Sequence, residues 1–257
     1  MKLSSPHIHP SARHGLRTVI QRERLLIQSL LLLVLMFGIG WALTSRDVVP
    51  EFSDAATVEE KKADFFAYLR PHVIEVNAKV LSDRERLQEL ISTDGSINLL
   101  DHFFLRRLRL LYLNQEADPQ DLHGLLNKVD IIPNSLALIQ AAKESGWGSS
   151  RFARNGYNFF GQQCFVRGCG FTPKNRSRGR SHEVAKFRST RDAVRAYIHN
   201  LNTHIRYASF REKRATLRRD GQPLKGEALA IGLDGYSERG YDYVTEIQAM
   251  IRANNLE

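Results

Sequence analysis

Glu144 is the residue whose surroundings in the sequence best suit acid–base chemistry. The stretch from Ser135 to Gly148 reads SLALIQAAKESGWG, in which small and apolar helix formers lead to Glu144 and two glycines follow. The side chain is therefore expected at a helix C-terminus beside Trp147. Desolvation by the indole and the negative end of the helix dipole both disfavour a carboxylate, so we expect a raised pKa. A glycosidase general acid needs this property; a surface glutamate at a helix end is the alternative.

An aromatic and amide-rich segment, NGYNFFG, follows at residues 155–161. Aromatic rings pack on the apolar faces of sugars, and amides can bond their acetamido groups, so this segment suits the wall of a glycan cleft. Substrate contacts are predicted for Trp147, Asn155, Tyr157, Asn158 and Phe160. Core packing is the alternative for the phenylalanines, and at least one of Phe159 and Phe160 is expected in the core.

A second carboxyl group is needed by most glycosidases. The first acidic residue after Glu144 is Glu183, because none occurs between Ser145 and His182. Glu183 is the leading candidate for the base, with Asp192 behind it, and a loop salt bridge to an arginine is the alternative. The histidines lack the spacing of a zinc site, and phosphate-loop, dinucleotide and nucleophile-elbow motifs are absent. We therefore predict neither a metal nor a cofactor.

The elements expected to position these residues are mainly helices. Helical patterns cover 58–69, 73–91 and 99–113, with Pro71 ending or restarting the first, and others begin at Asn134, Ser189 and Tyr241. Residues 162–187 lack a helical period, which predicts a loop or a small β-lobe. Within it, Cys164 and Cys169 are candidates for a disulfide if the compartment is oxidising, with two free thiols as the alternative.

An apolar segment at residues 25–43 is long enough to cross a bilayer as a helix. The 24 residues before it carry five basic side chains and one acidic side chain. The positive-inside rule therefore keeps the N-terminus in the cytoplasm and exports the rest. A buried core helix and a cleaved signal peptide are the alternatives to an uncleaved anchor.

The charge of the 257-residue chain is unevenly distributed. The formal net charge is +9, and 42% of the residues are hydrophobic, which indicates a folding chain with an anionic partner. Residues 140–220 carry 18 basic and 5 acidic side chains, whereas the segments on either side are acidic. If the chain is exported, nucleic acid is excluded. The pattern then predicts a basic lobe that faces an anionic wall polymer.

Three segments, VDIIPNSLALIQAAKESGWGSSRFA, NFFG and LDGYSERGYDYVTEIQAMI, resemble the glucosaminidase domain of glycoside hydrolase family 73. The likeness covers about residues 125–255 and is strongest to the Bax-type members from Gram-negative bacteria. It implies a lysozyme-like α+β fold that hydrolyses the β-1,4 bond after N-acetylglucosamine in peptidoglycan. Glu144 falls on the essential acid of the family, and Glu183 falls at about the place of its second carboxylate.

The tyrosine pattern of the family has two tyrosines six residues apart. Here Tyr236 is followed at five residues by Tyr241 and at seven by Tyr243. Tyr243 is the better match for the second, so it is predicted to be catalytic, and Tyr236 and Tyr241 are predicted to contact substrate. The resemblance leaves open whether Glu183 activates water or whether the substrate's own acetamido group reacts, positioned by a tyrosine.

The predicted organisation has four parts: a cytoplasmic basic tail at 1–24, a transmembrane anchor at 25–43, a helical membrane-proximal region at 44–120, and a lysozyme-like glucosaminidase domain at 121–257. The domain is expected to be predominantly helical with a small β-lobe, and to lie in the periplasm, anchored to the inner membrane. Its expected partners are peptidoglycan glycan strands. A lytic transglycosylase that uses one carboxyl group and a non-catalytic cell-wall-binding protein are the alternatives.

Overall fold

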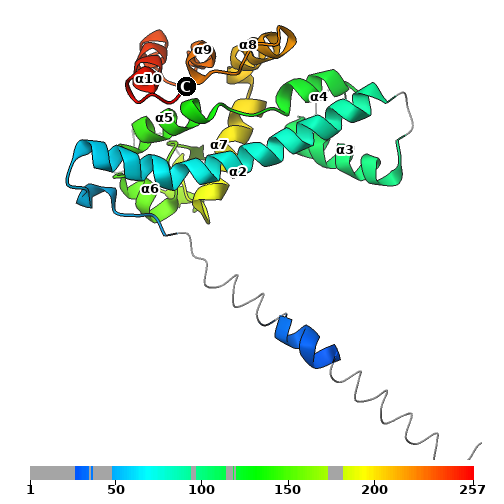
Figure 1. The fold of residues 1–257 in the computed structure, drawn as a ribbon, viewed down its shortest axis with the longest axis horizontal. Coiled ribbons are helices and arrows are strands. Elements are labelled where there is room, and N and C mark those ends of the chain that lie inside the picture. The colour runs from blue at the N-terminus through cyan, green and yellow to red at the C-terminus, as the bar shows by residue number, and fades with distance from the viewer. Residues whose placement is uncertain are drawn as a thin grey trace, which may run out of the picture. The chain divides into compact units, whose positions relative to one another are not determined.

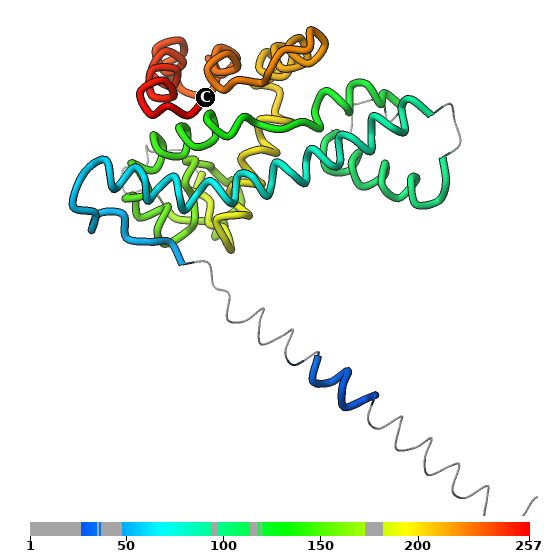
Figure 2. Tube along the Cα trace, viewed as in Figure 1, coloured from blue at the N-terminus to red at the C-terminus, as the bar shows by residue number. Residues whose placement is uncertain are grey.

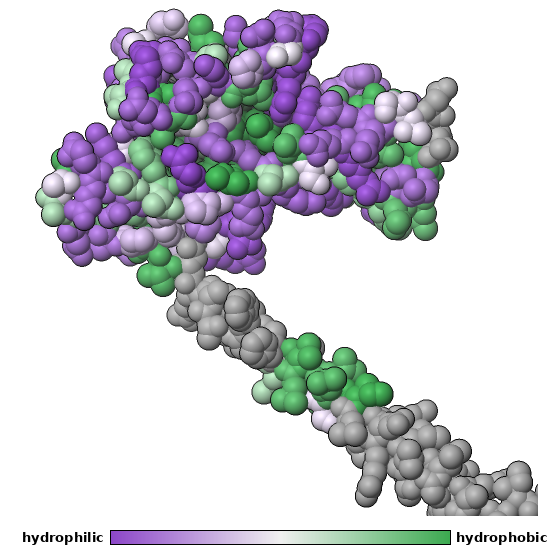
Figure 3. Space-filling view, viewed as in Figure 1, coloured by the Kyte–Doolittle hydropathy of each residue, from purple (hydrophilic) through white to green (hydrophobic). Residues whose placement is uncertain are grey.

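A computed structural model describes residues 27–34, 36, 48–93, 97–113, 118, 120–172 and 182–257. The chain divides into two units, residues 1–48 and 49–257. In the first, the helical residues 27–34 and 36 present mostly hydrophobic side chains (Figure 3). Within the described ranges, none of the helices has both the length and the apolar character needed to span a membrane. Most of the predicted anchor at 25–43 lies outside the described residues.

The second unit is built mainly from helices (Figure 1). In chain order its α-helices are α2 (Val58–Ser92), α3 (Leu99–Tyr112), α4 (Leu122–Lys128), α5 (Asn134–Ser145), α6 (Arg151–Gly156), α7 (Thr190–Thr203), α8 (Ala208–Arg219), α9 (Gly226–Leu229) and α10 (Tyr241–Ala253). Short 3-10 helices are η1 (Phe52–Asp54), η2 (Ile205–Tyr207) and η3 (Ala230–Leu233). The predominantly helical α+β class predicted from the sequence is confirmed.

Helix α2 is one continuous helix of 35 residues, drawn as the long cyan tube in Figure 2. The prediction that Pro71 ends or restarts it was wrong. Proline removes a backbone donor and usually kinks a helix interior. Here the buried side chains keep the 3–4 residue spacing of a single face on both sides of the proline, at Phe65, Leu69, Val73, Val76 and Val80. Packing along this face therefore outweighs the local preference.

Helix α2 shares its core with the second half of the chain. It packs against α5 and α7 along its first part and against α4 further along. Phe65 of α2 lies edge-on to Phe52 of η1 and contacts Phe159, with all three rings buried. Helix α2 is therefore part of the scaffold behind α5. Residue 121, where the predicted glucosaminidase domain begins, lies within the unit formed by residues 49–257.

A three-stranded antiparallel sheet forms the small lobe between α6 and α7. Its strands are β1 (Gln163–Cys164), β2 (Gly170–Phe171) and β3 (Glu183–Ala185), in the order β1-β3-β2. Cys164 pairs with Glu183, and Phe171 pairs with Val184. The sequence prediction of a loop or small β-lobe over 162–187 is thus confirmed for the described residues.

Candidate active site

Helix α5 brings Glu144 to the surface at its last turn. Nine of its twelve residues are buried, so the helix runs through the core. Gly146 adopts the left-handed conformation (φ 59°) that ends helices favourably, and its N–H caps the last turn. Glu144 itself is exposed. The sequence prediction of a carboxyl group at a helix C-terminus is confirmed.

Gly148 shows why the second glycine of the GWG motif is needed. Its φ is +76°, and a Cβ there would lie 2.3 Å from the Phe52 ring. A side chain at this position would push η1 away from α2. The motif therefore serves packing as well as helix termination.

A chain of buried hydrogen bonds holds the Glu144 carboxyl group. The Tyr243 hydroxyl donates to Oε1 of Glu144 at 3.0 Å. That hydroxyl accepts from Nε2 of Gln140 at 3.0 Å, and Oε1 of Gln140 accepts from the Tyr197 hydroxyl at 2.6 Å. Tyr197 donates to Gln140 and Gln140 donates to Tyr243, so the hydroxyl hydrogen of Tyr243 is directed at the Glu144 carboxyl group. Gln140, Tyr197 and Tyr243 are all buried, so this direction is fixed by packing.

Stacked rings keep the tyrosines in place. Tyr236 stacks on Tyr243 with ring centroids 5.4 Å apart, and its hydroxyl donates to the backbone oxygen of Phe160. Phe160 in turn stacks on Tyr197 at 4.0 Å. The segment after α6, helix α7 and the start of α10 therefore meet around the end of α5.

Gly161 lies beside the second carboxyl oxygen of Glu144. A Cβ on Gly161 would come within 3.6 Å of Oε2, and its φ of +64° favours glycine. Glu144 is exposed and its Oε2 lies on the side of Gly161, whereas Oε1 is engaged by Tyr243. The carboxyl group thus has one positioned oxygen and one oxygen open to a ligand.

Desolvation dominates the electrostatics of this site. It raises the pKa of Glu144, against the opposing effects of the Tyr243 hydrogen bond and the Lys143 charge. Burial, followed by the adjacent Glu144 carboxyl group, raises the pKa of Tyr243 far above its ordinary value. Tyr243 is therefore a neutral donor at every physiological pH. A raised carboxyl pKa is a property that suits a general acid.

The family model for mannosyl-glycoprotein endo-β-N-acetylglucosaminidases, named Glucosaminidase, matches residues 120–256, just over half of the chain. The chain belongs to the glucosaminidase family. It is therefore a glycosidase, as the sequence resemblance implied. It is similar to the protein bax of Escherichia coli K12, with 42% identity over 130 residues that cover 51% of this chain and 46% of that protein. The match thus spans about half the length of that relative. No solved structure gives a significant match.

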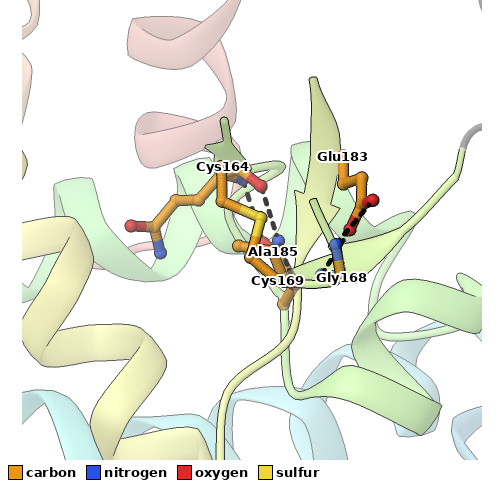
Figure 4. Close-up of a disulfide and its surroundings, with 8 residues drawn as sticks. Cys164, Gly168, Cys169, Glu183 and Ala185 are labelled. Carbon is orange, nitrogen blue, oxygen red and sulfur yellow. Dashed lines mark hydrogen bonds between the residues drawn. A yellow bond between two sulfur atoms is a disulfide. The ribbon is translucent and has the colours of Figure 1, made fainter. Parts of the chain in front are cut away.

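In this glucosaminidase, Glu183 lies in the β-lobe. Its carboxylate is buried and accepts hydrogen bonds from the backbone N–H groups of Gly168 (3.0 Å) and Gly170 (2.8 Å) (Figure 4). These contacts clamp the connection between β1 and β2. Each carboxylate oxygen of Glu183 accepts one backbone N–H. These contacts are those of a residue that stabilises the β-lobe.

Cys164 and Cys169 close the same connection with a disulfide (Figure 4). Together with Glu183 they form a grouping of potential metal ligands in the described part of the chain. Disulfide sulfurs are not thiolates, and a metal site needs the thiolate form. The disulfide and the Glu183 clamp therefore act on the same turn as structural links.

Three of the predicted sugar-contacting residues face the protein interior. Asn158 is buried, and its amide bonds the backbone oxygens of Gln162 (2.8 Å) and Ala185 (2.9 Å), which ties the lobe to the helices. Phe160 is buried and, like Phe159, belongs to the core. Trp147 is partly buried and packs edge-on against the rings of Phe65 and Phe66. Its indole thus supports the scaffold behind Glu144.

The other predicted contacts lie nearer to solvent. Asn155 and Tyr241 are exposed, and Tyr157 and Tyr236 are partly buried. Tyr157 ends α6 in the left-handed conformation (φ 56°). Of the two C-terminal tyrosines, Tyr243 bonds Glu144, whereas Tyr241 is 64% exposed.

Gln140 and Tyr197 were not identified as site residues from the sequence. Gln140 precedes Glu144 by one helical turn, so the two lie on the same side of α5. Gln140 stands within the apolar run LALIQAA, and a glutamine amide buried in such a run needs hydrogen-bond partners. That was a usable signal for Gln140; no comparable signal marks Tyr197.

Removing the Tyr243 hydroxyl should move the pH profile in a definite direction. The hydrogen bond from Tyr243 lowers the pKa of Glu144, whereas burial raises it. Tyr243→Phe leaves the burial and removes the donor, so the alkaline limb of kcat/KM should shift to higher pH. The loss of a positioning bond should also reduce kcat roughly tenfold. Tyr241→Phe removes the hydroxyl of a mostly exposed tyrosine and is the matched control for the pH profile, in which it should leave the alkaline limb in place. An alkaline limb moving to lower pH in Tyr243→Phe would contradict the assignment.

Proposed function

We propose that this enzyme is a peptidoglycan hydrolase with a lysozyme-like catalytic domain that cleaves the β-1,4 bond after N-acetylglucosamine. The supporting observation is the Glu144 carboxyl group, which combines an accessible Oε2, a fixed neutral donor on Oε1 and a raised pKa. Membership of the glucosaminidase family supplies the bond type. The identity of the polymer rests on the resemblance to cell-wall enzymes.

In the proposed mechanism, Glu144 donates its proton to the glycosidic oxygen of the leaving sugar. The carboxylate that remains keeps the hydrogen bond from Tyr243, which favours the charged form as the bond breaks. Gln140 and Tyr197 hold Tyr243 in that orientation. They act as positioning residues, because their hydrogen bonds reach Glu144 through Tyr243.

For the second step of the reaction, the contacts of Glu183 favour a mechanism in which the substrate's acetamido group reacts, over one in which a protein base activates water. Both oxygens of Glu183 accept backbone N–H bonds within the lobe, which leaves this carboxylate committed to the turn at Gly168 and Gly170. An acetamido group that attacks the anomeric carbon from within the substrate needs one protein acid, which Glu144 supplies. As the acetamido oxygen bonds to that carbon, the bond to the leaving sugar breaks, and the Glu144 carboxylate then takes a proton from the water that opens the cyclic intermediate.

The proposal is tested by the chemistry of the digest. Purified peptidoglycan incubated with the full chain should release fragments that end in reducing N-acetylglucosamine, identified by borohydride reduction and mass spectrometry. Reducing N-acetylmuramic acid ends would instead indicate the wrong bond. Glycan strands that stay intact after prolonged incubation would contradict the proposed hydrolase activity.

A lytic transglycosylase is the second candidate, because it too works with a single carboxyl group. The commitment of Glu183 to backbone N–H groups is the observation that favours it. The same digest separates the two activities. Anhydro-muramyl ends would support the transglycosylase and overturn the glucosaminidase specificity.

We also propose that the glycosidase domain is exported and remains attached to the inner membrane through residues 25–43. The basic tail, the apolar segment and the Cys164–Cys169 disulfide support this, since disulfides persist in oxidising compartments. A C-terminal fusion to a reporter that is active only after export should be active and membrane-associated. Activity of a cytoplasm-specific reporter at the same position would reverse the predicted topology.

A further inference from the structure

A buried cluster of charges lies away from Glu144, where α2, α4 and α8 meet. Asp130, only 2% exposed, accepts two hydrogen bonds from Arg218, at 3.2 and 2.8 Å. Its carboxylate also lies 3.5 Å from Nη1 of Arg84 and 3.7 Å from Nε of Arg214. Three guanidinium groups thus surround one carboxylate.

Among the described residues, these three arginines share one acidic partner, Asp130. Arg84 also donates to the backbone oxygen of Val129, and Arg214 donates to those of Ile131 and Asn127. Carbonyl groups satisfy donors but carry no net charge. Arg214 is fully buried, and burial lowers its pKa to about 10. Arg84 and Arg214 are buried and share one carboxylate with Arg218, whose side chain is 34% exposed and faces solvent. Buried charges in proteins are normally paired, so an anion that enters from the solvent side would balance this cluster.

A cavity of about 360 Å³ opens onto this cluster. Its polar lining includes Arg84, Gln88, His123, Asn127, Arg218 and Arg219, and Asp130 is the only acidic residue among the lining residues. Arg218 uses Nε and Nη2 on Asp130. Arg219 makes only a loose contact with Asp220 at 3.9 Å and one bond to Thr216. The cavity therefore presents guanidinium groups that have donors to spare.

We propose that this cavity binds an anion through a carboxylate or phosphate group held between Arg218 and Arg219. Planar guanidinium groups match both kinds of oxyanion with paired, charge-assisted hydrogen bonds. His123, Gln88 and Asn127 provide further polar contacts around such a group. The volume is large enough to admit such a group.

The proposed site is separate from the catalytic centre. Asp130 lies four residues before α5 begins, and Glu144 lies in the last turn of that helix. At 1.5 Å per residue, the helix alone separates the two ends by roughly 15 Å. An anion in the cavity would neutralise the cluster that joins α2 to α8 and so stabilise the connection into α5. It would therefore raise thermal stability without entering the reaction.

The test is to titrate the full chain with inorganic phosphate and, separately, with N-acetylglycine at constant ionic strength and chloride concentration. Calorimetry should give saturable binding of one anion per chain, and Tm should rise with ligand concentration. Saturation by phosphate alone or by N-acetylglycine alone would support the site and identify the group it takes. Absence of saturable binding by both would overturn the proposal.

Arg219→Gln and Lys213→Gln form the matched pair of variants. Both remove one positive charge from α8, but only Arg219 lines the cavity, and neither belongs to the Asp130 cluster, so both should fold. Arg219→Gln should weaken anion binding about tenfold or more, whereas Lys213→Gln should leave it within about twofold. Equal losses of anion affinity in the two variants would mean that binding depends on the net charge of α8 and not on the cavity. That result would overturn the proposed site.

Discussion

Glu144→Gln should reduce hydrolysis of purified peptidoglycan by roughly 10²–10⁴-fold while leaving the fold unchanged. The amide keeps the shape of the side chain and can still accept the Tyr243 hydrogen bond at its oxygen. It has no acidic proton to give to the leaving sugar. The exposed position of Glu144 means that little stability should be lost. Release of reducing ends over time measures the rate of hydrolysis, and thermal unfolding measures the stability of the fold.

Glu183→Gln is the matched control, because it makes the same chemical change at a carboxylate bound by two backbone N–H groups. The amide can accept only one of those bonds, so hydrogen exchange at Gly168 and Gly170 should quicken. Activity should stay at least tenfold above that of Glu144→Gln. Equal loss in both variants, with unchanged exchange in the lobe, would instead make Glu183 the base.

The local features of the site were predictable because they follow from short-range rules. A run of helix formers ended by Gly146 places Glu144 at a helix end whatever the rest of the chain does. The preference for Tyr243 came from the family pattern, and the hydrogen bond to Glu144 gives it a physical basis. Such inferences need no knowledge of distant contacts.

The features that were missed depend on contacts between distant segments. Pro71 breaks a helix by local rules, but the buried face of α2 continues through it against α5 and α7. The indole of Trp147 packs against Phe65 and Phe66 of α2, a contact that the residues around it in the sequence do not indicate. In each case the deciding partner lies more than 60 residues away or on another helix.

The charge sum behind the predicted basic lobe includes cations that have structural roles. Two of the basic residues between 140 and 220, Arg211 and Arg214, are buried, and Arg218 is bound to Asp130. Others, at positions 174–180, lie outside the described residues. Net charge along the sequence does not distinguish a cation that faces a ligand from one that holds helices together. The helix-linking arginines of α8 therefore do not contribute a substrate-facing surface.

Asp130→Asn should lower the free energy of unfolding by about 3–5 kcal/mol at neutral pH. The carboxylate is the common partner of Arg84, Arg214 and Arg218, and the amide that replaces it leaves three buried or half-buried cations without a counter-charge. The three arginines come from α2 and α8, so the loss should loosen the contact between these helices. Urea unfolding at pH 7 in phosphate-free buffer measures the difference.

The pH dependence of that difference separates charge from shape. Burial opposes ionisation of Asp130, but the hydrogen bond from Arg218 and the charges of Arg214 and Arg84 lower its pKa overall. A lowered folded-state pKa contributes stability above the unfolded value of about 3.9 and loses it as the pH falls through the folded value. The difference in unfolding free energy between wild type and Asp130→Asn should therefore become small under acidic conditions.

Asp220→Asn is the control. It removes an exposed carboxylate 3.9 Å from Arg219 and should lower the free energy of unfolding by less than about 1 kcal/mol. A gap for Asp130→Asn that stays constant down to acidic pH would show that the side chain stabilises the junction by its packing, and that its charge is not what holds the three arginines together.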